Sequence, residues 1–391
     1  MRGLWRRVAG LVCCSLVTLG VVWPSCLVPA EAAQAGARSC SGAGVQPSPS
    51  PGSFDGLTGI AVLGTGNAWA VGHYFGAGGR VRTMIEHWDG RRWRQVASRN
   101  PAADDSLTAV AAVSPADVWA VGSMSSGAPF SDRPLVEHWD GSAWRVVPAP
   151  GAGTLIGLAT AAADDVWAVG STVDGNKPVR TLAERWDGTR WRVVGSPNTG
   201  PYGNRLVAVS AASPSSVWAV GTADTKAGTG SLAEHWDGTR WSVVPIPQIG
   251  LDDTLNAIAS AGARDVWAVG AYDQQTPVGT VTYALTWHWD GTRWSAYPSP
   301  GPTGDDVLEG VTAVSASDIW AVGTTAGDPA RVQRWNGHQW ILQRSPYVHG
   351  ALNLAAAVAA SPATGVWIVG GYIALSNYSY HTLTEHLCPP A

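Results

Sequence analysis

Short apolar segments bounded by turn residues recur along the chain, and no segment places its apolar residues at the spacing of a helix. One unit shows the order. Residues 107–113 are small and apolar, 118–122 read Val-Trp-Ala-Val-Gly, 135–139 read Leu-Val-Glu-His-Trp, and 144–147 read Trp-Arg-Val-Val. Asp140-Gly141, between the last two segments, is typical of a tight hairpin. The pattern predicts four short strands per unit and an all-β protein.

This unit occurs seven times, which explains why the chain has 22 Trp but only 3 Phe. One Trp lies in the Val-Trp-Ala-Val-Gly block, a second ends the third segment, and a third follows five residues later. Regular spacing of this kind indicates a repeat fold. The first set is Trp69, Trp119, Trp167, Trp218, Trp267, Trp320 and Trp367; the second is Trp88, Trp139, Trp186, Trp236, Trp289 and Trp335; the third is Trp93, Trp144, Trp191, Trp241, Trp294 and Trp340.

Seven units of about 50 residues with four strands each predict a seven-bladed β-propeller. The first strand of each unit carries Ala, Val and Gly, as expected near the axis where blades converge. The Trp residues lie on later strands, where the gap between blades widens. Both faces of a blade are covered by its neighbours, which explains the nearly continuous apolar runs.

The last unit predicts how the ring closes. Residues 383–388 lack the hairpin Trp, and no fourth strand follows. Residues 45–51 resemble the Pro-rich end of a fourth strand such as 296–301, so we expect an N-terminal strand to complete the last blade. Aligning the prolines places Cys40 and Cys388 at the turn of that blade, which predicts a disulfide; two unrelated surface thiols are the alternative.

The N-terminus has the features of an export signal. Arg2, Arg6 and Arg7 precede an uncharged apolar run at 8–22, and Ala30-Glu31-Ala32 offers a small-x-small cleavage site. Because the run is short for a membrane span, we expect cleavage near Ala32 and a secreted protein with no membrane span in its mature chain. An uncleaved anchor is the alternative. The expected parts are a signal peptide at 1–32, a short linker at 33–37 and the propeller at 38–391.

The repeat resembles kelch repeats and the galactose-oxidase-type propellers. Residues 118–122 resemble the kelch strand that ends in Gly-Gly, and Trp139-Asp140-Gly141 with Trp144 resembles the hairpin and Trp that follow. The likeness covers about residues 38–388. The sequence departs from kelch because the second Gly is present only at Gly370-Gly371 and the hairpin is shorter. The Trp-Asp pair is also typical of WD repeats, the alternative family, but those have shorter units and a different preceding motif.

Most repeated polar residues are expected to be structural, since a position spread around a ring cannot converge on one metal. The Asp residues that begin the second strands are expected to bond turn backbones, and the Trp residues to pack blade against blade rather than stack on sugars. The positions concerned are His87, His138, His235, His288 and His386, with Arg185 and Arg334 in the other two units; Glu86, Glu137, Glu184, Glu234 and Glu385; and Asp117, Asp165, Asp265 and Asp318.

One repeated polar position is a candidate for ligand binding. It lies two residues before the first-strand Leu, in the loops that join one blade to the next, with Asp104, Asp252 and Asp305 directly before three of its members. A partial ring of carboxylates there could attract Ca²⁺, which prefers oxygen ligands, or a basic ligand; capping of the strand start is the alternative. The candidates are Asp55, Asp105, Asn204, Asp253 and Asp306, with Gly153 and Gly350 in the remaining units.

Aromatic residues in the variable loops are the expected place for a sugar site. No catalytic sequence motif is found. The oxidases that the repeat resembles use copper with a Tyr–Cys crosslink, which a Cys40–Cys388 disulfide would prevent, so no cofactor and no metal site is expected. The loop aromatics are Tyr74, Phe75, Phe130, Tyr202, Tyr272, Tyr372, Tyr378 and Tyr380.

Composition narrows the function classes. Hydrophobic residues make up 45% and charged residues 14% of the chain, which excludes a disordered protein. The net charge of -4 argues against nucleic-acid binding through a basic face. The sequence favours a monomeric, exported module that binds a glycan or a protein. A carbohydrate-active enzyme using loop carboxylates such as Asp105 and Asp253, and a structural surface protein, are the alternatives.

Overall fold

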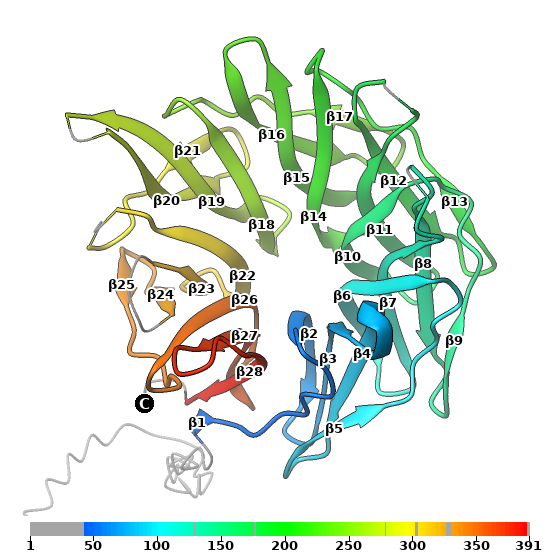
Figure 1. Ribbon diagram of the computed structural model, residues 1–391. Helices are drawn as coiled ribbons and strands as arrows, with labels where there is room; N and C mark the ends of the chain where they lie inside the picture. Colours follow the sequence, from blue (N-terminus) through cyan, green and yellow to red (C-terminus); the bar gives the residue numbers. More distant parts are fainter. Residues whose placement is uncertain are drawn as a thin grey trace, which may run out of the picture. The chain divides into compact units, whose positions relative to one another are not determined.

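The computed structural model describes residues 43–388, except 129, 176, 278, 302–303 and 326–329. In this part of the chain, seven four-stranded antiparallel sheets follow one another around a ring (Figure 1). The protein is therefore a seven-bladed β-propeller, as the repeat predicts. The expected signal peptide, its cleavage site and Cys40 lie outside the described residues.

The first strand of each blade lies nearest the centre of the ring (Figure 1). Small side chains let neighbouring blades approach closely there, and hydroxyls tie them together: Thr58 donates to the Leu107 carbonyl of the next blade at 3.0 Å, and Thr108 to that of Leu155 at 2.9 Å. These strands are β2 (Gly56–Gly64), β6 (Asp104–Ser114), β10 (Thr154–Ala162), β14 (Gly203–Ser213), β18 (Asp253–Gly262), β22 (Val307–Ser315) and β26 (Ala351–Ser361).

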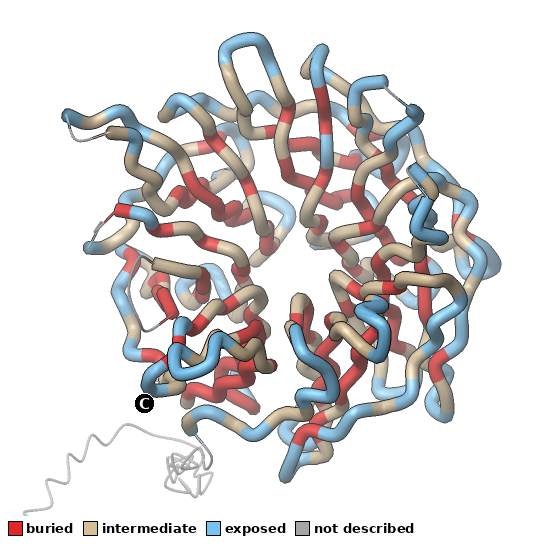
Figure 2. The backbone as a smooth tube through the Cα atoms, in the orientation of Figure 1, coloured by how far each residue is buried: buried red, intermediate tan, exposed pale blue. Residues whose placement is uncertain are grey.

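The second strands form the buried middle of each blade (Figure 2). Each second strand contains a Gly at the same place, where the backbone of the first strand comes too close for a side chain. A Cβ on Gly72 would lie 1.9 Å from the Gly56 carbonyl oxygen, and one on Gly122 would lie 2.0 Å from that of Ser106. The first strand bulges at this point, which brings its backbone inward. The second strands are β3 (Asn67–Phe75), β7 (Asp117–Ser125), β11 (Asp165–Thr172), β15 (Ser216–Thr225), β19 (Asp265–Thr276), β23 (Asp318–Thr324) and β27 (Gly365–Ala374).

The third strands follow variable loops, the first of which contains a short 3₁₀ turn, η1 (Ala77–Gly79). They are β4 (Val81–Trp88), β8 (Arg133–Trp139), β12 (Arg180–Trp186), β16 (Gly228–Trp236), β20 (Gly279–Trp289), β24 (Arg331–Trp335) and β28 (Tyr380–Leu387).

The fourth strands are short and form the outer edge of the ring. The Asp-Gly hairpins lead into them as predicted: Asp89 Oδ1 accepts from the amides of Arg91 and Arg92 at 3.0 Å each, and Gly90 has a φ of 90°. These strands are β5 (Trp93–Val96), β9 (Trp144–Val146), β13 (Trp191–Val193), β17 (Trp241–Val243), β21 (Trp294–Ala296), β25 (Trp340–Leu342) and β1 (Gly44–Val45).

The Trp residues pack blade against blade. Trp69 of the first blade contacts the two hairpin Trp residues of the second, with ring centroids 4.9 Å from Trp139 and 5.3 Å from Trp144. Trp367 makes the same contacts with Trp88 and Trp93 across the closure of the ring. These indoles therefore serve the core, as the sequence favours.

The repeated His and Arg residues also serve the blades. His138 stacks on Trp119 with centroids 4.1 Å apart, and its Nε2 lies 2.8 Å from Asp117. Arg185 takes the same place in the third blade and donates to Asp165 at 2.7 Å. The expectation that the Asp residues at the start of the second strands bond turn backbones is corrected here. Each of them pairs with the His or Arg side chain on the neighbouring third strand; they are Asp117, Asp165, Asp265 and Asp318.

The last blade is completed by the N-terminal segment, as predicted. Gly44 and Val45 of β1 pair with His386 and Glu385 of β28. Beyond β1, the Gln46 amide donates to the Thr384 carbonyl at 2.8 Å. Because the partner predicted for Cys388 lies outside the described residues, the Cys40–Cys388 pairing stays a prediction.

Candidate functional site

The five candidate residues Asp55, Asp105, Asn204, Asp253 and Asp306 are buried, with at most 3% of each exposed. Four of them accept hydrogen bonds from the amides of their own interblade linker: Asp55 from Gly52 at 2.9 Å, for example, and Asp253 from Gly250 at 2.8 Å. Asp306 pairs with Arg331. The structure spreads the five around the ring, one per blade, and the capping role left open by the sequence accounts for these contacts.

In the last blade, the equivalent residue is Asn353 and not Gly350. Gly370 pairs with Ala355, as Gly72 pairs with Leu57 in the first blade, so the assignment from the sequence, which took Leu352 as the first-strand Leu, is three residues too early there. Asn353 is buried and accepts from the Val348 amide at 2.9 Å. Among the described residues, no group of three or more His, Cys, Asp or Glu side chains is placed to hold a metal ion.

Exposed apolar side chains gather at one end of the propeller. This end, called here the linker face, carries the linkers between blades and the loops between second and third strands. Most of the exposed large apolar residues lie on it, and the others lie on outer fourth strands. Apolar exposure of this kind is a feature of binding surfaces. The linker-face residues are Phe54, Phe130, Val173, Tyr202, Ile249, Leu251, Leu352, Leu375 and Tyr378.

One aromatic group on the linker face lies where the last blade meets the first. Phe54, which is 52% exposed, has its ring centroid 5.6 Å from Phe75 and 5.5 Å from Tyr380. We call these three residues the seam cluster. Two of them are among the loop aromatics singled out in the sequence.

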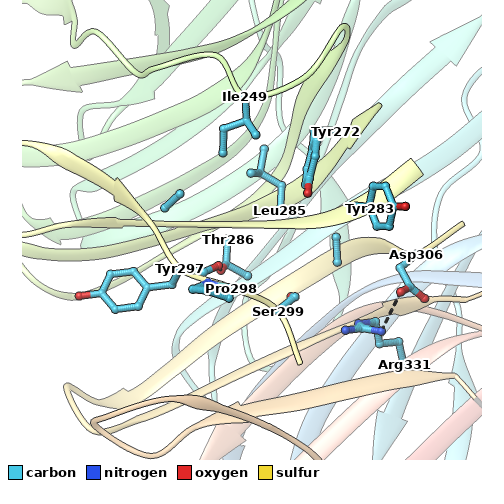
Figure 3. Close-up of a pocket in the computed structure, with 12 residues that line it drawn as sticks. Ile249, Tyr272, Tyr283, Leu285, Thr286, Tyr297, Pro298, Ser299, Asp306 and Arg331 are labelled. Atoms are coloured by element: carbon cyan, nitrogen blue, oxygen red, sulfur yellow. Dashed lines mark hydrogen bonds and ion pairs between the residues drawn. The ribbon is translucent and has the colours of Figure 1, made fainter. Parts of the chain in front are cut away.

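A pocket of about 310 Å³ opens beside β20, between the fifth and sixth blades (Figure 3). Tyr272 and Tyr283 lie on one side of it, with ring centroids 5.6 Å apart. Tyr297 and Ser299 come from the linker to the sixth blade, and Asp306 follows in the same linker. Burial raises the pKa of the Tyr272 hydroxyl. Asp306 is thus the one member of the repeated polar position that lines this pocket, and Tyr272 is one of the loop aromatics singled out in the sequence.

Arg331 is the unusual residue of the pocket. Its side chain is 4% exposed, and its Nη1 lies 3.1 Å from the Asp306 carboxylate, the pair joined by the dashed line in Figure 3. Its Nη2 donates to the Pro300 carbonyl at 2.6 Å, but its Nε has no hydrogen-bond partner among the described residues. Burial lowers the pKa of the guanidinium, while Asp306 acts in the opposite direction. A buried donor without a partner is costly.

The repeat is broken at this pocket. Arg331 pairs with Gly323 across the sheet, the place where every other blade has a buried Leu or Met. Gln333 replaces the Glu of most blades, and Tyr297 replaces the Val that lies at this point of three other linkers. Sequence reasoning missed Arg331, although aligning the third strands on their Glu-His-Trp would have shown it. The aliphatic equivalents of Arg331 are Met84, Leu135, Leu182, Leu232, Leu285 and Leu383.

Several side-chain polar groups of the pocket are bonded within the protein. Thr286 Oγ1 donates to the Tyr297 carbonyl at 2.5 Å, and Ser299 Oγ donates to Gln333 at 3.0 Å. Asp306, the only carboxylate among the lining residues, faces Arg331. The pocket therefore combines aromatic walls with a small set of polar groups, which include the hydroxyls of its tyrosines, as ligand pockets commonly do.

No helix among the described residues is long and apolar enough to cross a membrane. No protein-family model matches the sequence, and no curated protein matches it either. The chain is similar in structure to "YCF48 from Cyanidioschyzon merolae", with 14% identity and a TM-score of 0.53 over 88% of this chain and 98% of that one. It is also similar to "YCF48 bound to D1 peptide", with 12% identity and a TM-score of 0.51 over 88% and 98%. A third similar structure is the polysaccharide lyase PL25-Ulvanlyase bound to -[GlcA(1-4)Rha3S]-, with 9% identity and a TM-score of 0.52 over 88% and 94%. Likeness at this level of identity establishes that the chain shares the propeller fold with these proteins.

Proposed function

We propose that this protein is a ligand-binding module and that its ligand occupies the pocket between the fifth and sixth blades. The observation that carries this proposal is Arg331. A buried aliphatic residue satisfies the fold at the same place in six other blades, so the fold does not require an arginine there. Among the described residues, the buried Nε of this arginine has no hydrogen-bond partner, and Arg331 lines the pocket, so we expect a bound ligand to accept from it.

The pocket favours binding over catalysis. Glycoside hydrolysis usually needs two carboxyl groups across the bound substrate, whereas Asp306 is the only carboxylate among the lining residues and is paired with Arg331. One similar propeller is bound to a peptide and another to a saccharide. The fold admits both kinds of ligand, so the choice between them depends on the pocket itself.

A double variant, Asp306→Asn with Arg331→Leu, tests the proposal without departing from the repeat. The fourth blade has Asn204 with Leu232 at these places, and the seventh has Asn353 with Leu383. The variant should fold, since replacing a buried ion pair by apolar residues of similar size is often neutral or stabilising. Residues 33–391 are screened against a display library of random seven-residue peptides and against a glycan array.

The expected result is a ligand from one of the two screens that binds the wild type and binds the double variant at least tenfold more weakly. Phe54→Ala, in the seam cluster on the same face, is the matched control and should bind like the wild type. Equal binding by wild type and double variant, with loss in Phe54→Ala, would place the ligand at the seam cluster and refute the proposal.

We also propose that the protein is exported and that it is related to the kelch-type propellers. The basic head, apolar run and Ala30-Glu31-Ala32 support cleavage of a signal peptide and an extracellular site of action. N-terminal sequencing of the secreted protein should find Ala33 as the first residue. The kelch-type relationship rests on the Val-Trp-Ala-Val-Gly strand and the Trp-Asp-Gly hairpin.

A further inference from the structure

Side chains of the interblade linkers cap the outer edge of the third strands. The fourth strand is short and pairs only with the end of the third strand. The first half of each third strand therefore has outward amides without a neighbouring strand. Asn100 Oδ1 accepts from the Thr83 amide at 2.9 Å, and Asn198 Oδ1 accepts from the Thr181 amide at 3.0 Å. In the last blade, Ser50 Oγ accepts from the Thr382 amide at 3.2 Å.

The other blades show what happens when this cap changes. In the fourth blade, the side-chain oxygen of Gln248 accepts from the Ser231 amide at 3.0 Å once the carboxamide is turned to suit its neighbours. In the second blade, the linker has Gly151 in place of the capping residue, and the strand has Pro134, which has no amide hydrogen to cap. Cap and amide are therefore either both present or both absent in these blades.

The fifth blade breaks this rule at the pocket. Its linker has Gly301 where the first, third and fourth blades have Asn or Gln, and its strand has Ala284, whose amide hydrogen is bonded to none of the described residues. Ala284 lines the pocket. Its amide points outward, because the flanking Thr282 and Thr286 turn their carbonyls outward to accept from Asp306 and Tyr297 at 3.2 and 3.0 Å. By the same alternation, the Ala284 carbonyl also faces outward.

We propose that the pocket binds a peptide, one residue of which pairs with the main chain of Ala284. One peptide residue accepts from the Ala284 amide and donates to its carbonyl, adding a single rung of β-pairing to the edge of β20. The occupied carbonyls of Thr282 and Thr286 limit the pairing to this residue. One side chain of the peptide fills the tyrosine-lined cavity, and a peptide carbonyl accepts from Arg331 Nε.

The main-chain groups at Ala284 favour a peptide over a saccharide. Among the polar side chains of the pocket, Thr286, Ser299 and Asp306 are engaged within the protein, and the three tyrosine hydroxyls are open to either kind of ligand. The groups that remain include the main chain of Ala284 and the Nε of Arg331. A main-chain amide and carbonyl on one residue match the carbonyl and amide of one peptide residue.

The test rests on the proposed function and separates its failure from that of the peptide model. A peptide enriched from the display library is titrated calorimetrically into wild type, Ala284→Pro and Ala284→Ser. The residues equivalent to Ala284 in the second and fourth blades are Pro134 and Ser231, so the fold accepts both substitutions. Proline removes the amide hydrogen, so the dissociation constant should rise at least tenfold; serine keeps it, so the constant should stay within twofold. Thermal melting of Ala284→Pro confirms that it is folded.

A scan that replaces each amide of the peptide by an ester gives a second readout. One internal ester should weaken binding, because it removes the hydrogen donated to the Ala284 carbonyl, and Ala284→Pro should reduce the affinity of every ester variant. Equal affinity of Ala284→Pro and wild type would overturn the peptide model, even if Asp306→Asn with Arg331→Leu abolishes binding. Binding to a glycan on the array, with no peptide enriched from the library, would also overturn the peptide model. If the double variant lost that binding, the pocket would remain the binding site.

Discussion

At the scale of single residues, the repeat distinguishes residues that build the propeller from one that does not. The hairpin Trp, the stacked His and the Gly of the second strand recur because each solves a packing problem that all blades share. Arg331 solves no such problem, since Leu or Met suffices elsewhere. In a repeat protein, a buried residue that departs from its equivalents is thus a stronger sign of function than a conspicuous one that recurs.

The buried Glu residues of the third strands predict a dependence of stability on pH. Burial raises the pKa of Glu86 to about 8, although Ser48 donates to its carboxylate at 2.7 Å, and raises the pKa of Glu137, Glu184 and Glu234 to about 7. Because these folded-state pKa values lie above the unfolded value, the stabilisation from each protonated carboxyl is complete below about pH 4.5. It is lost as the pH rises through 7 to 8.

Glu86→Gln isolates this effect, and Gln333 shows that the blades accept glutamine at this place. The variant and wild type should have similar free energies of unfolding at pH 5, and the variant should be more stable at pH 9 by on the order of 1–3 kcal/mol. Thermal or urea unfolding at both pH values measures the difference. The lowered pKa values of His73, His87 and His235 affect wild type and variant alike. A difference that does not change with pH would contradict the prediction.

At the scale of elements, the interblade linkers decide which strand edges are closed. Their position follows from the sequence, because Pro-rich segments between strands are readily recognised as loops. Their hydrogen bonds do not, since Asn100 reaches Thr83 only after the chain has folded back across the blade. In the last blade, Asn353 and not Gly350 holds the linker, because Ala355 stands where the other blades have the first-strand Leu and Leu352 resembles it in sequence; the pairing of Ala355 with Gly370 shows the correct register.

Amide hydrogen exchange should reveal the uncapped edge directly. In the ligand-free protein, the amides of Thr83 and Thr181 are bonded to Asn side chains and should exchange slowly. The Ala284 amide has Gly301 at the capping place and no hydrogen-bond partner among the described residues, so it should exchange faster, by at least tenfold after correction for intrinsic rates. Exchange followed by NMR checks this, and saturating display peptide should slow Ala284 selectively. Protection of Ala284 equal to that of Thr83 without ligand would contradict the prediction.

At the scale of the whole molecule, ring closure depends on a two-residue strand. The pairs of Gly44 and Val45 with β28 are reinforced by Thr384 Oγ1, which donates to the Gln46 carbonyl at 2.7 Å, and by Ser50 beside Thr382. The Trp367 contact with Trp88 and Trp93 closes the ring from the inside. Because this strand is so short, we expect a covalent link at this blade to stabilise the closed ring.

We expect the predicted Cys40–Cys388 disulfide to stabilise the oxidised protein by on the order of 5 kcal/mol, because it would close a loop of nearly the whole chain. A reductant should therefore lower the melting temperature of the wild type. Cys388→Ser is the matched control and should melt at that lower temperature with or without reductant. Two free thiols in a non-reducing peptide map would contradict this expectation.

The sequence by itself determined the architecture of this protein, because every blade faces the same packing problem and solves it with the same Trp, Gly and Asp-Gly signals. Seven copies of one short pattern carry enough information to set strand number, blade number and even the closing strand. The pocket could not be read in this way. Arg331 lies on the third strand of the sixth blade and Asp306 in the linker that leads into that blade, and only the folded blade brings them within 3.1 Å. Likewise, the buried placement of Asp55 and Asp253 depends on linkers that fold back over them. Repetition specifies the fold locally, whereas the site arises where two non-identical blades meet, and that meeting exists only in the tertiary structure.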